Sequence, residues 1–378
     1  MRLDLSKTYR LPVSKNDNFN AWIEITTHCN IRCPGCYRGC DRPEHRGLHK
    51  TLHEIRQEIL ELQRLRNPSM VSISGGEALL HPDLEAIVSF VKGLGLAPVL
   101  FTNGLLLDDR RLARLRATGL VAVVVRVDTL QEQHQGKTES DLSAHRETLA
   151  ALAARHDVFL VLTSCIDRSN LDQIPSLLRW GRVNAHQVGQ HLLILKRGLV
   201  LEPSDPLEPE GMVFVTELVE TLEREDADLR FSTWLGSDRS AQDAKWLQAM
   251  RLVAGGVELG WTDSRFMEAV QSLSHWFTGR YVGLKPRKEQ RLSLPTAILI
   301  SVVFRCFRGM VAKWLANPSL WFGRAHLQAI TIVAPPHFVD GRRDLCDGCP
   351  DAILHQGALV PSCALAEIER YGHPYEIG

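Results

Sequence analysis

Short apolar runs alternate with amphipathic segments about six times between residues 21 and 195, and this alternation constrains the fold more than any other feature of the sequence. The intervening segments have apolar residues at helical spacing or a proline near their start, which is typical of helices. Strands that alternate with helices form parallel βαβ units with right-handed crossovers. We therefore predict an α/β fold, a partial (β/α)6 TIM-like barrel. The expected strands are 21–26, 70–74, 97–101, 121–127, 158–163 and 191–195, and the expected helices are 52–66, 81–92, 107–118, 141–155 and 174–180.

Polar residues and glycines are concentrated where these strands end. A cysteine-rich loop follows the first strand, and the later strand ends carry Gly75-Gly76-Glu77, Asn103, Asp128 and Ser164 in that order. In parallel α/β architectures the carboxyl ends of the strands share one edge, and ligands bind there. We therefore expect these residues to form one site.

The loop after the first strand contains Cys29, Cys33 and Cys36 in a C-x3-C-x2-C arrangement. Three thiolates on one short loop can converge on a single metal centre. Structural zinc sites and cysteine-bound iron–sulfur clusters normally use four protein ligands, so three cysteines leave one coordination position for another molecule. The alternative is a zinc site completed by Cys40 or His28.

This loop, with Tyr37 directly after Cys36, resembles the signature loop of the radical S-adenosylmethionine (radical SAM) enzymes. Gly75-Gly76-Glu77, about forty residues later, resembles the glycine–glycine–glutamate motif of that family. The resemblance implies that the three cysteines hold a 4Fe–4S cluster whose remaining iron is chelated by the amino and carboxylate groups of SAM. It also implies reductive cleavage of SAM to methionine and a 5′-deoxyadenosyl radical, which removes hydrogen from an unactivated carbon.

The same resemblance implies a SAM pocket. The glycine backbone and Glu77 would hold the ammonium group of SAM, and Tyr37 would lie against the adenine. Asp128 would bind the ribose hydroxyls, and Arg126, which replaces the usual serine, would pair with the carboxylate. Ser164 and Asn170 are candidate ribose contacts. The expected SAM-binding residues are Tyr37, Gly75, Gly76, Glu77, Asn103, Arg126, Asp128 and Ser164.

A second cysteine group, Cys346, Cys349 and Cys363, lies near the end of the chain. A C-x2-C pair with a distant third cysteine is typical of zinc or iron–sulfur ligation. The segment resembles the auxiliary-cluster modules, called SPASM or twitch, that extend some radical SAM enzymes. One ligand set implies one auxiliary 4Fe–4S cluster. Cys306 is the expected fourth ligand; a position left open for substrate, or a structural zinc site, are the alternatives.

Charge and cysteine distribution limit the remaining possibilities. The chain has 44 basic and 44 acidic residues, so no nucleic-acid partner is expected. Residues 1–20 lack an apolar signal core, and the clustered cysteines favour metal ligation in the cytoplasm over disulfides. Residues 292–304 are apolar but too short to span a bilayer, and peripheral membrane association is the minor alternative. The expected divisions are a lead-in (1–20), the radical SAM barrel (21–195), a variable helical connector (196–285) and an auxiliary-cluster module (286–378).

These features predict a radical SAM oxidoreductase or bond-forming enzyme. Its substrate is expected to be a peptide or small natural product that undergoes oxidation or C–C or C–S bond formation with help from the auxiliary cluster. A lipid acyl chain is the alternative substrate, and a non-catalytic zinc-binding protein is the alternative from another class. The expected electron donor is a reductase such as flavodoxin or ferredoxin.

Overall fold

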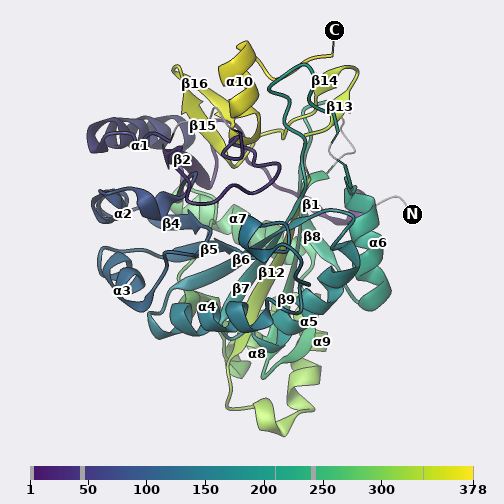
Figure 1. Ribbon diagram of the computed structural model, residues 1–378. Coiled ribbons are helices and arrows are strands. Elements are labelled where there is room, and N and C mark those ends of the chain that lie inside the picture. Colours follow the sequence, from purple (N-terminus) through teal and green to yellow (C-terminus); the bar gives the residue numbers. More distant parts are fainter. Residues whose placement is uncertain (1–3, 43–46, 209, 240–243, 335, 378) are drawn as a thin grey trace.

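Six parallel strands form the centre of the molecule, in the order of the sequence (Figure 1). The structure is a computed structural model that describes residues 4–42, 47–208, 210–239, 244–334 and 336–377. The six strands are β2 (Asn20–Thr26), β3 (Met70–Gly75), β4 (Ala97–Thr102), β5 (Ala122–Arg126), β6 (Phe159–Ile166) and β7 (Val188–Leu195). The helices that connect them are α1 (Leu52–Arg66), α2 (Leu84–Gly93), α3 (Asp109–Ala117), α4 (Ser143–Arg155) and α5 (Ile174–Val183). The predicted partial barrel is thus confirmed.

Strand β5 is apolar on both faces for most of its length, as parallel strands covered on both sides are. Within β5, Val123 and Val125 belong to the outer core shared with the helices, whereas Val124 belongs to an inner cluster with Phe159 and Leu192. The inner cluster forms the apolar wall of the barrel interior. This alternation directs successive side chains to the helices or to the interior.

The sheet continues beyond β7. Strand β12 (Ala325–Val333) pairs in parallel with β7, and β9 (Ala244–Ala254) and β8 (Phe231–Gly236) follow in antiparallel pairing. The outermost strand is β1 (Tyr9–Arg10), while β10 (Val257–Trp261) pairs with β9 and β11 (Arg291–Leu292) pairs with β12. The sheet therefore combines elements that are far apart in the sequence.

Residues 196–285, which we expected to be a helical connector, contain helices α6 (Val215–Glu225) and α7 (Ser264–Thr278) but also strands β8, β9 and β10. The helical expectation was wrong for these strands. Strand β9 carries polar side chains whose partners are distant: Arg251 donates to Gln328 at 2.6 Å, and Lys245 pairs with Asp344 at 2.6 Å. Such pairing satisfies buried charges in the folded chain but leaves no local signal in the sequence.

The two ends of the barrel are covered by different segments (Figure 1). Helices α8 (Leu294–Val303) and α9 (Arg305–Leu315) lie at the lower end. The C-terminal segment lies at the upper end and contains β13 (Phe338–Val339), β14 (Arg342–Arg343), β15 (Ala352–His355), β16 (Ala358–Pro361) and α10 (Leu365–Tyr371). Trp22 of β2 packs with Ile353 and Leu365, so the β15–β16 hairpin and α10 cover the edge of the sheet at β2.

Candidate active site

A cavity of about 360 Å³ lies at the carboxyl ends of the central strands. Its lining includes Cys29, Cys33 and Cys36 from the loop after β2, and Arg126 from the end of β5. Asp351 and Ser362 of the C-terminal segment also reach it. The predicted gathering of strand ends at one site is therefore present in the fold.

The cysteine loop is fixed by contacts with neighbouring strand ends. The Asn103 side chain donates to the Asn30 side chain at 2.7 Å, and the Arg32 amide donates to Glu132 at 2.5 Å. Arg38 forms a buried ion pair with Glu24 of β2 at 2.8 Å. These contacts hold the loop at the mouth of the barrel.

Cys40 lies beside the first cysteine group. Its thiol interacts with those of both Cys29 and Cys36, and this hydrogen bonding lowers the pKa of Cys36 to about 6. Cys33 faces Arg126 instead, and burial raises its pKa. Thiolate is the form that binds metals. Within the described residues, no group of three or more cysteine, histidine or acidic side chains is gathered tightly enough to hold a metal ion.

The donor set nevertheless suits an iron–sulfur cluster. Three thiols of one loop line the same cavity, and this chemistry fits a cluster that leaves one iron for a small molecule. The ligand assignment of Cys29, Cys33 and Cys36 stays a prediction.

Gly75 and Gly76 pack directly against the cysteine loop. A Cβ atom on Gly75 would lie 2.1 Å from the Thr26 carbonyl oxygen, and one on Gly76 would lie 2.5 Å from the His28 carbonyl oxygen. The Gly76 amide donates to Thr26 at 2.9 Å, and the Glu77 amide donates to His28 at 2.8 Å. The φ of Gly75 is 143°, a region that side chains disfavour. The two glycines therefore allow β3 to meet the backbone of the loop.

Glu77 is buried beneath the cavity and is not part of its lining. Its carboxylate accepts hydrogen bonds from the Thr102 hydroxyl at 2.7 Å, the Asn103 amide at 2.7 Å and the Leu79 amide at 2.9 Å. Burial raises its pKa. In this conformation Glu77 joins the ends of β3 and β4.

Arg126 and Asp128 form a unit at the end of β5. The Arg126 Nε donates to Asp128 at 2.8 Å, and the Cys165 and Leu130 amides donate to the same carboxylate at 2.8 and 2.9 Å. Arg126 lines the cavity, whereas Asp128 is fully buried behind it. Asp128 therefore positions the guanidinium in this structure.

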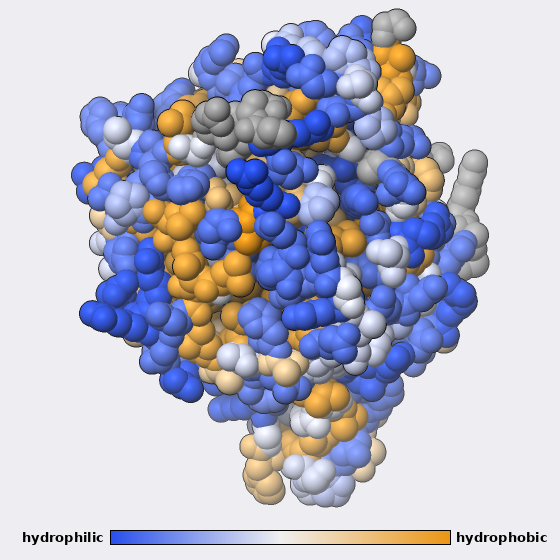
Figure 2. Space-filling model, in the orientation of Figure 1, coloured by the Kyte–Doolittle hydropathy of each residue, from blue (hydrophilic) through white to orange (hydrophobic). Residues whose placement is uncertain are grey.

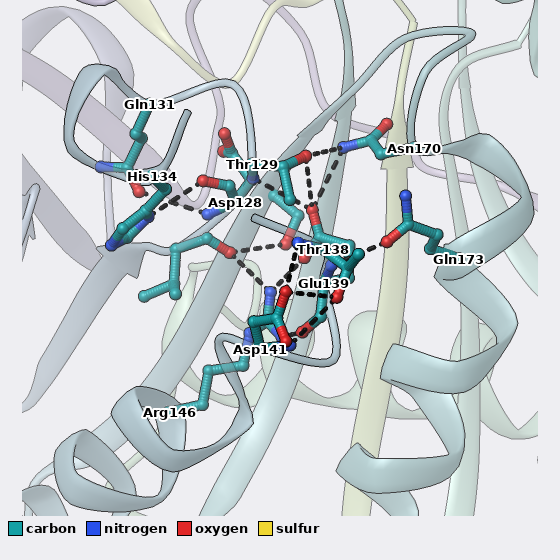
Figure 3. Close-up of polar contacts among 12 residues, drawn as sticks. Asp128, Thr129, Gln131, His134, Thr138, Glu139, Asp141, Arg146, Asn170 and Gln173 are labelled. Carbon is teal, nitrogen blue, oxygen red and sulfur yellow. Dashed lines mark hydrogen bonds and ion pairs between the residues drawn. The ribbon is translucent and has the colours of Figure 1, made fainter. Parts of the chain in front are cut away.

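The loop after β5 is held by a buried network that the sequence did not indicate (Figure 3). Glu139 forms a buried ion pair with Arg146 and accepts hydrogen bonds from the Thr129 amide at 3.1 Å and the Asn170 side chain at 3.2 Å. Arg146 also donates to the Val127 carbonyl at 3.0 Å. Glu139 and Arg146 lie apart from any recognisable motif, so only the fold brings them to this site.

The expected SAM-binding residues thus divide into two sets. Those that line the cavity are Tyr37, Gly75, Gly76, Asn103 and Arg126, and those buried behind its wall are Glu77, Asp128 and Ser164. The Ser164 hydroxyl donates to the Val127 carbonyl at 3.2 Å. Asn170 uses its amide inside the Glu139 network and is also buried.

The second cysteine group lies next to the barrel wall. The thiols of Cys346 and Cys349 interact, and Cys363 is near Cys349 and Asp351. Buried Arg66 of α1 donates to the Cys349 carbonyl at 2.8 Å and to the Asn20 carbonyl at 2.9 Å. This arginine joins the cysteine segment to the barrel.

Cys306 is not brought to this group. It lies on α9, at the end of the molecule opposite to β15 and β16 (Figure 1), and packs into an apolar core with Phe266 and Phe307. Its neighbours include Asp263. The structure therefore separates the expected fourth ligand from the other three cysteines.

Comparison with known proteins agrees with the site. Residues 23–180 match the family model described as the radical SAM superfamily. An AdoMet-dependent heme synthase of Methanosarcina barkeri (strain Fusaro / DSM 804) is 30% identical over 156 residues, which is 41% of this chain and 44% of that protein. A PqqA peptide cyclase of Xanthomonas campestris pv. campestris (strain B100) is 29% identical over 168 residues, or 42% of this chain and 43% of that protein. The chain spans less than half the length of these curated relatives.

Solved structures with similar folds include Streptococcus suis SuiB bound to S-adenosylmethionine, with 14% identity and a TM-score of 0.43 over 55% of this chain and 47% of that chain. Another is native anSMEcpe with bound AdoMet and Cp18Cys peptide, with 12% identity and a TM-score of 0.42 over 73% and 70% of the two chains.

The fold, the cysteine loop and the glycine motif define an α/β barrel protein with a cysteine-rich centre at its strand ends. Through residues 23–180, the chain is similar to the radical SAM superfamily.

Proposed function

We propose that this protein is an enzyme that cleaves SAM reductively and uses the resulting radical to abstract hydrogen from an unactivated C–H bond. The observation that carries the proposal is that Cys29, Cys33, Cys36, the Gly75–Gly76 backbone and Arg126 all line one cavity. When bound, the 4Fe–4S cluster supplies one electron to SAM, which yields methionine and the 5′-deoxyadenosyl radical. A flavodoxin or ferredoxin is the proposed source of that electron.

In this proposal the residues of the chain position the reactants. Cys29, Cys33 and Cys36 hold the cluster, and Arg126 presents its guanidinium to the SAM carboxylate, because Asp128 holds it toward the cavity. The Glu77 carboxylate fixes the strand ends that frame the glycines, and it would have to exchange a present partner to bind the SAM ammonium group. The apolar walls around Phe101 and Leu192 exclude water from the reaction.

The auxiliary cluster is proposed on Cys346, Cys349 and Cys363. Because Cys306 lies in another core, we favour the alternative in which the fourth position is open. The auxiliary cluster would bind the substrate or accept an electron from the product radical. Asp351 and Ser362, which flank these cysteines, line the cavity and so connect the auxiliary site with the substrate space.

The leading proposed substrate is a peptide or small natural product, and the matched relatives are named for a peptide and for heme. A specific observation favours a lipid acyl chain as the second candidate. A further cavity of about 420 Å³ lies deeper in the barrel and shares Phe101, Val124, Leu192 and Trp246 with the upper cavity. Two apolar cavities that meet at a common wall suit an elongated apolar substrate.

Anaerobic purification tests the chemistry. The protein should be brown, absorb at about 400 nm and contain about eight iron atoms per chain if two 4Fe–4S clusters are present. With dithionite and SAM it should release 5′-deoxyadenosine, and Cys33→Ala should abolish that release. Colourless protein with zinc at both cysteine groups would support the zinc-binding alternative and refute the proposal. An iron content of about four atoms per chain would refute only the proposed auxiliary cluster.

A further inference from the structure

Helix α8 presents an apolar face to solvent at the lower end of the barrel. Leu299, Val302 and Val303 are about 70% exposed (71%, 68% and 71%), and only Leu294 and Ala297 of this helix are buried. Phe322, in the turn after α9, is 99% exposed. Figure 2 shows apolar residues on the protrusion at this end of the molecule. Exposure of side chains of this size to water is unfavourable, and an exposed apolar patch of this kind is typical of an interaction surface.

The segment around this face is strongly basic, although the whole chain is neutral. Residues 285–324 contain eight lysines and arginines and a single acidic residue, Glu289. Arg291, Arg305 and Lys313 of this segment are exposed. An apolar face bordered by cations is complementary to a lipid surface with anionic headgroups, where each basic side chain strengthens binding roughly fivefold.

The geometry suits a helix that lies on a membrane. Helix α8 has 10 residues, which at 1.5 Å per residue is about half the hydrocarbon thickness of a bilayer. No helix among the described residues is long and apolar enough to cross a membrane. The inner side of the α8–α9 pair is anchored by Phe307 and Trp314, which are fully buried. The outer side is therefore held on a rigid support.

The deeper cavity lies close to this surface. Phe266 and Met267 of α7 line that cavity and also belong to the apolar core that includes α8 and α9. Lys285 and Glu289, both exposed, line the cavity where it approaches the surface, and the chain runs from them directly into α8. The cavity therefore approaches the surface close to the start of α8 in the chain.

We propose that α8 and the turn at Phe322 dock on the surface of an anionic phospholipid bilayer, with the deeper cavity turned toward the lipid. Docking itself does not depend on SAM cleavage. Only its use, the delivery of an apolar substrate to the barrel, rests on the proposed function.

Vesicle flotation tests the proposal with the full-length, anaerobically purified protein. The protein should float with vesicles of equimolar phosphatidylglycerol and phosphatidylcholine, float much less with phosphatidylcholine alone, and be released at high salt. Leu299→Glu should weaken binding at least tenfold, as should the double change Arg305→Glu and Lys313→Glu.

Control substitutions of exposed apolar residues elsewhere on the protein distinguish the loss of the docking surface from a general loss of exposed apolar area. Leu60→Glu on α1, where Leu60 is 42% exposed, should bind vesicles like the wild type. Phe322→Ser removes a side chain with almost no packing to lose, so it should retain the fold and lose binding. Phe214→Ser, at a half-exposed phenylalanine before α6, is its control.

Several results would overturn the proposal. Wild-type protein that does not float with the anionic vesicles would refute it, as would Phe322→Ser protein that floats as well as the wild type. A dimer in sedimentation analysis that Leu299→Glu converts to monomer, without vesicle binding, would assign the face to a second copy of the chain. SAM cleavage that persists in all these variants leaves the proposed function standing whichever result is obtained.

Discussion

The contact between Gly76 and the cysteine loop can be tested by one methyl group. In Gly76→Ala, the new Cβ would lie 2.5 Å from the His28 carbonyl oxygen and 2.7 Å from the Thr27 carbonyl oxygen. Ordinary van der Waals contact begins at 3.4 Å, so β3 and the loop must separate by about 0.9 Å. The three nearest atoms all belong to the backbone, so the closest contacts cannot be relieved by rotation of a side chain. The same His28 oxygen accepts the Glu77 amide, and that hydrogen bond would be strained as well.

We expect Gly76→Ala to lower the free energy of unfolding by about 2–4 kcal/mol, from overpacking and weakened hydrogen bonds. A displacement near 1 Å at the cysteine loop should reduce SAM cleavage by about a hundredfold. The assays are iron content after anaerobic reconstitution, release of 5′-deoxyadenosine and urea unfolding, with circular dichroism to verify that the variant is folded. Gly93→Ala is the control, because a Cβ on Gly93 in α2 meets no atom within 4 Å. Wild-type iron content and SAM cleavage in Gly76→Ala would refute the packing argument.

Three further predictions concern parts of the fold away from this contact. Cys363→Ser should remove the iron of the proposed auxiliary site, whereas Cys306→Ser should leave the iron content unchanged. Equal losses of iron in the two variants would show that Cys306 is a ligand after all. Arg66→Met should cost about 2–4 kcal/mol in urea unfolding, since it leaves the buried Asn20 and Cys349 carbonyls without their donor, while the exposed Arg64→Met should be nearly neutral. His191, with no hydrogen-bond partner for either ring nitrogen among the described residues, has its pKa lowered by burial from 6.5 to about 3. Between pH 6.5 and pH 3, His191 is protonated in the unfolded chain but stays neutral in the folded one. The free energy of unfolding therefore falls as the pH drops below about 6.5, by about 2 kcal/mol at pH 5. His191→Leu should lose that share of the pH dependence, and an unchanged slope in urea unfolding would contradict the assignment.

The sequence was informative wherever the interactions are local. Apolar runs and helical spacing located the six barrel strands, because each depends on neighbours within one βαβ unit. The cysteine loop and the glycine motif were likewise found at the ends of β2 and β3. The role of the glycines was less visible: the sequence suggested close approach to a ligand, whereas in the structure Gly75 and Gly76 make their close approach to the backbone of the loop.

Long-range pairing accounts for what the sequence did not show. Strand β9 is polar at Lys245 and Arg251, and pairing with residues distant in the sequence, such as Asp344 and Gln328, makes it compatible with burial. Glu139 has no motif around it, yet it organises the loop after β5 through Arg146. Cys306 was the expected fourth ligand, but the packing of α9 on Phe266 places it in another core.

The open edge of the barrel explains why the C-terminal segment matters to the site. Strand β2 is the last strand of the sheet, so its far side has no hydrogen-bonded neighbour in the sheet. The β15–β16 hairpin covers this edge: Ala352 and Leu359 join the outer core, while Ile353 packs on Trp22 at the inner side. Asp351 enters next to this hairpin and accepts a hydrogen bond from Asn20 at 3.1 Å. The segment that carries the second cysteine group therefore also forms part of the wall of both cavities. A substitution in the second cysteine group should therefore alter the shape of the proposed substrate cavity, which the first cysteine group also lines.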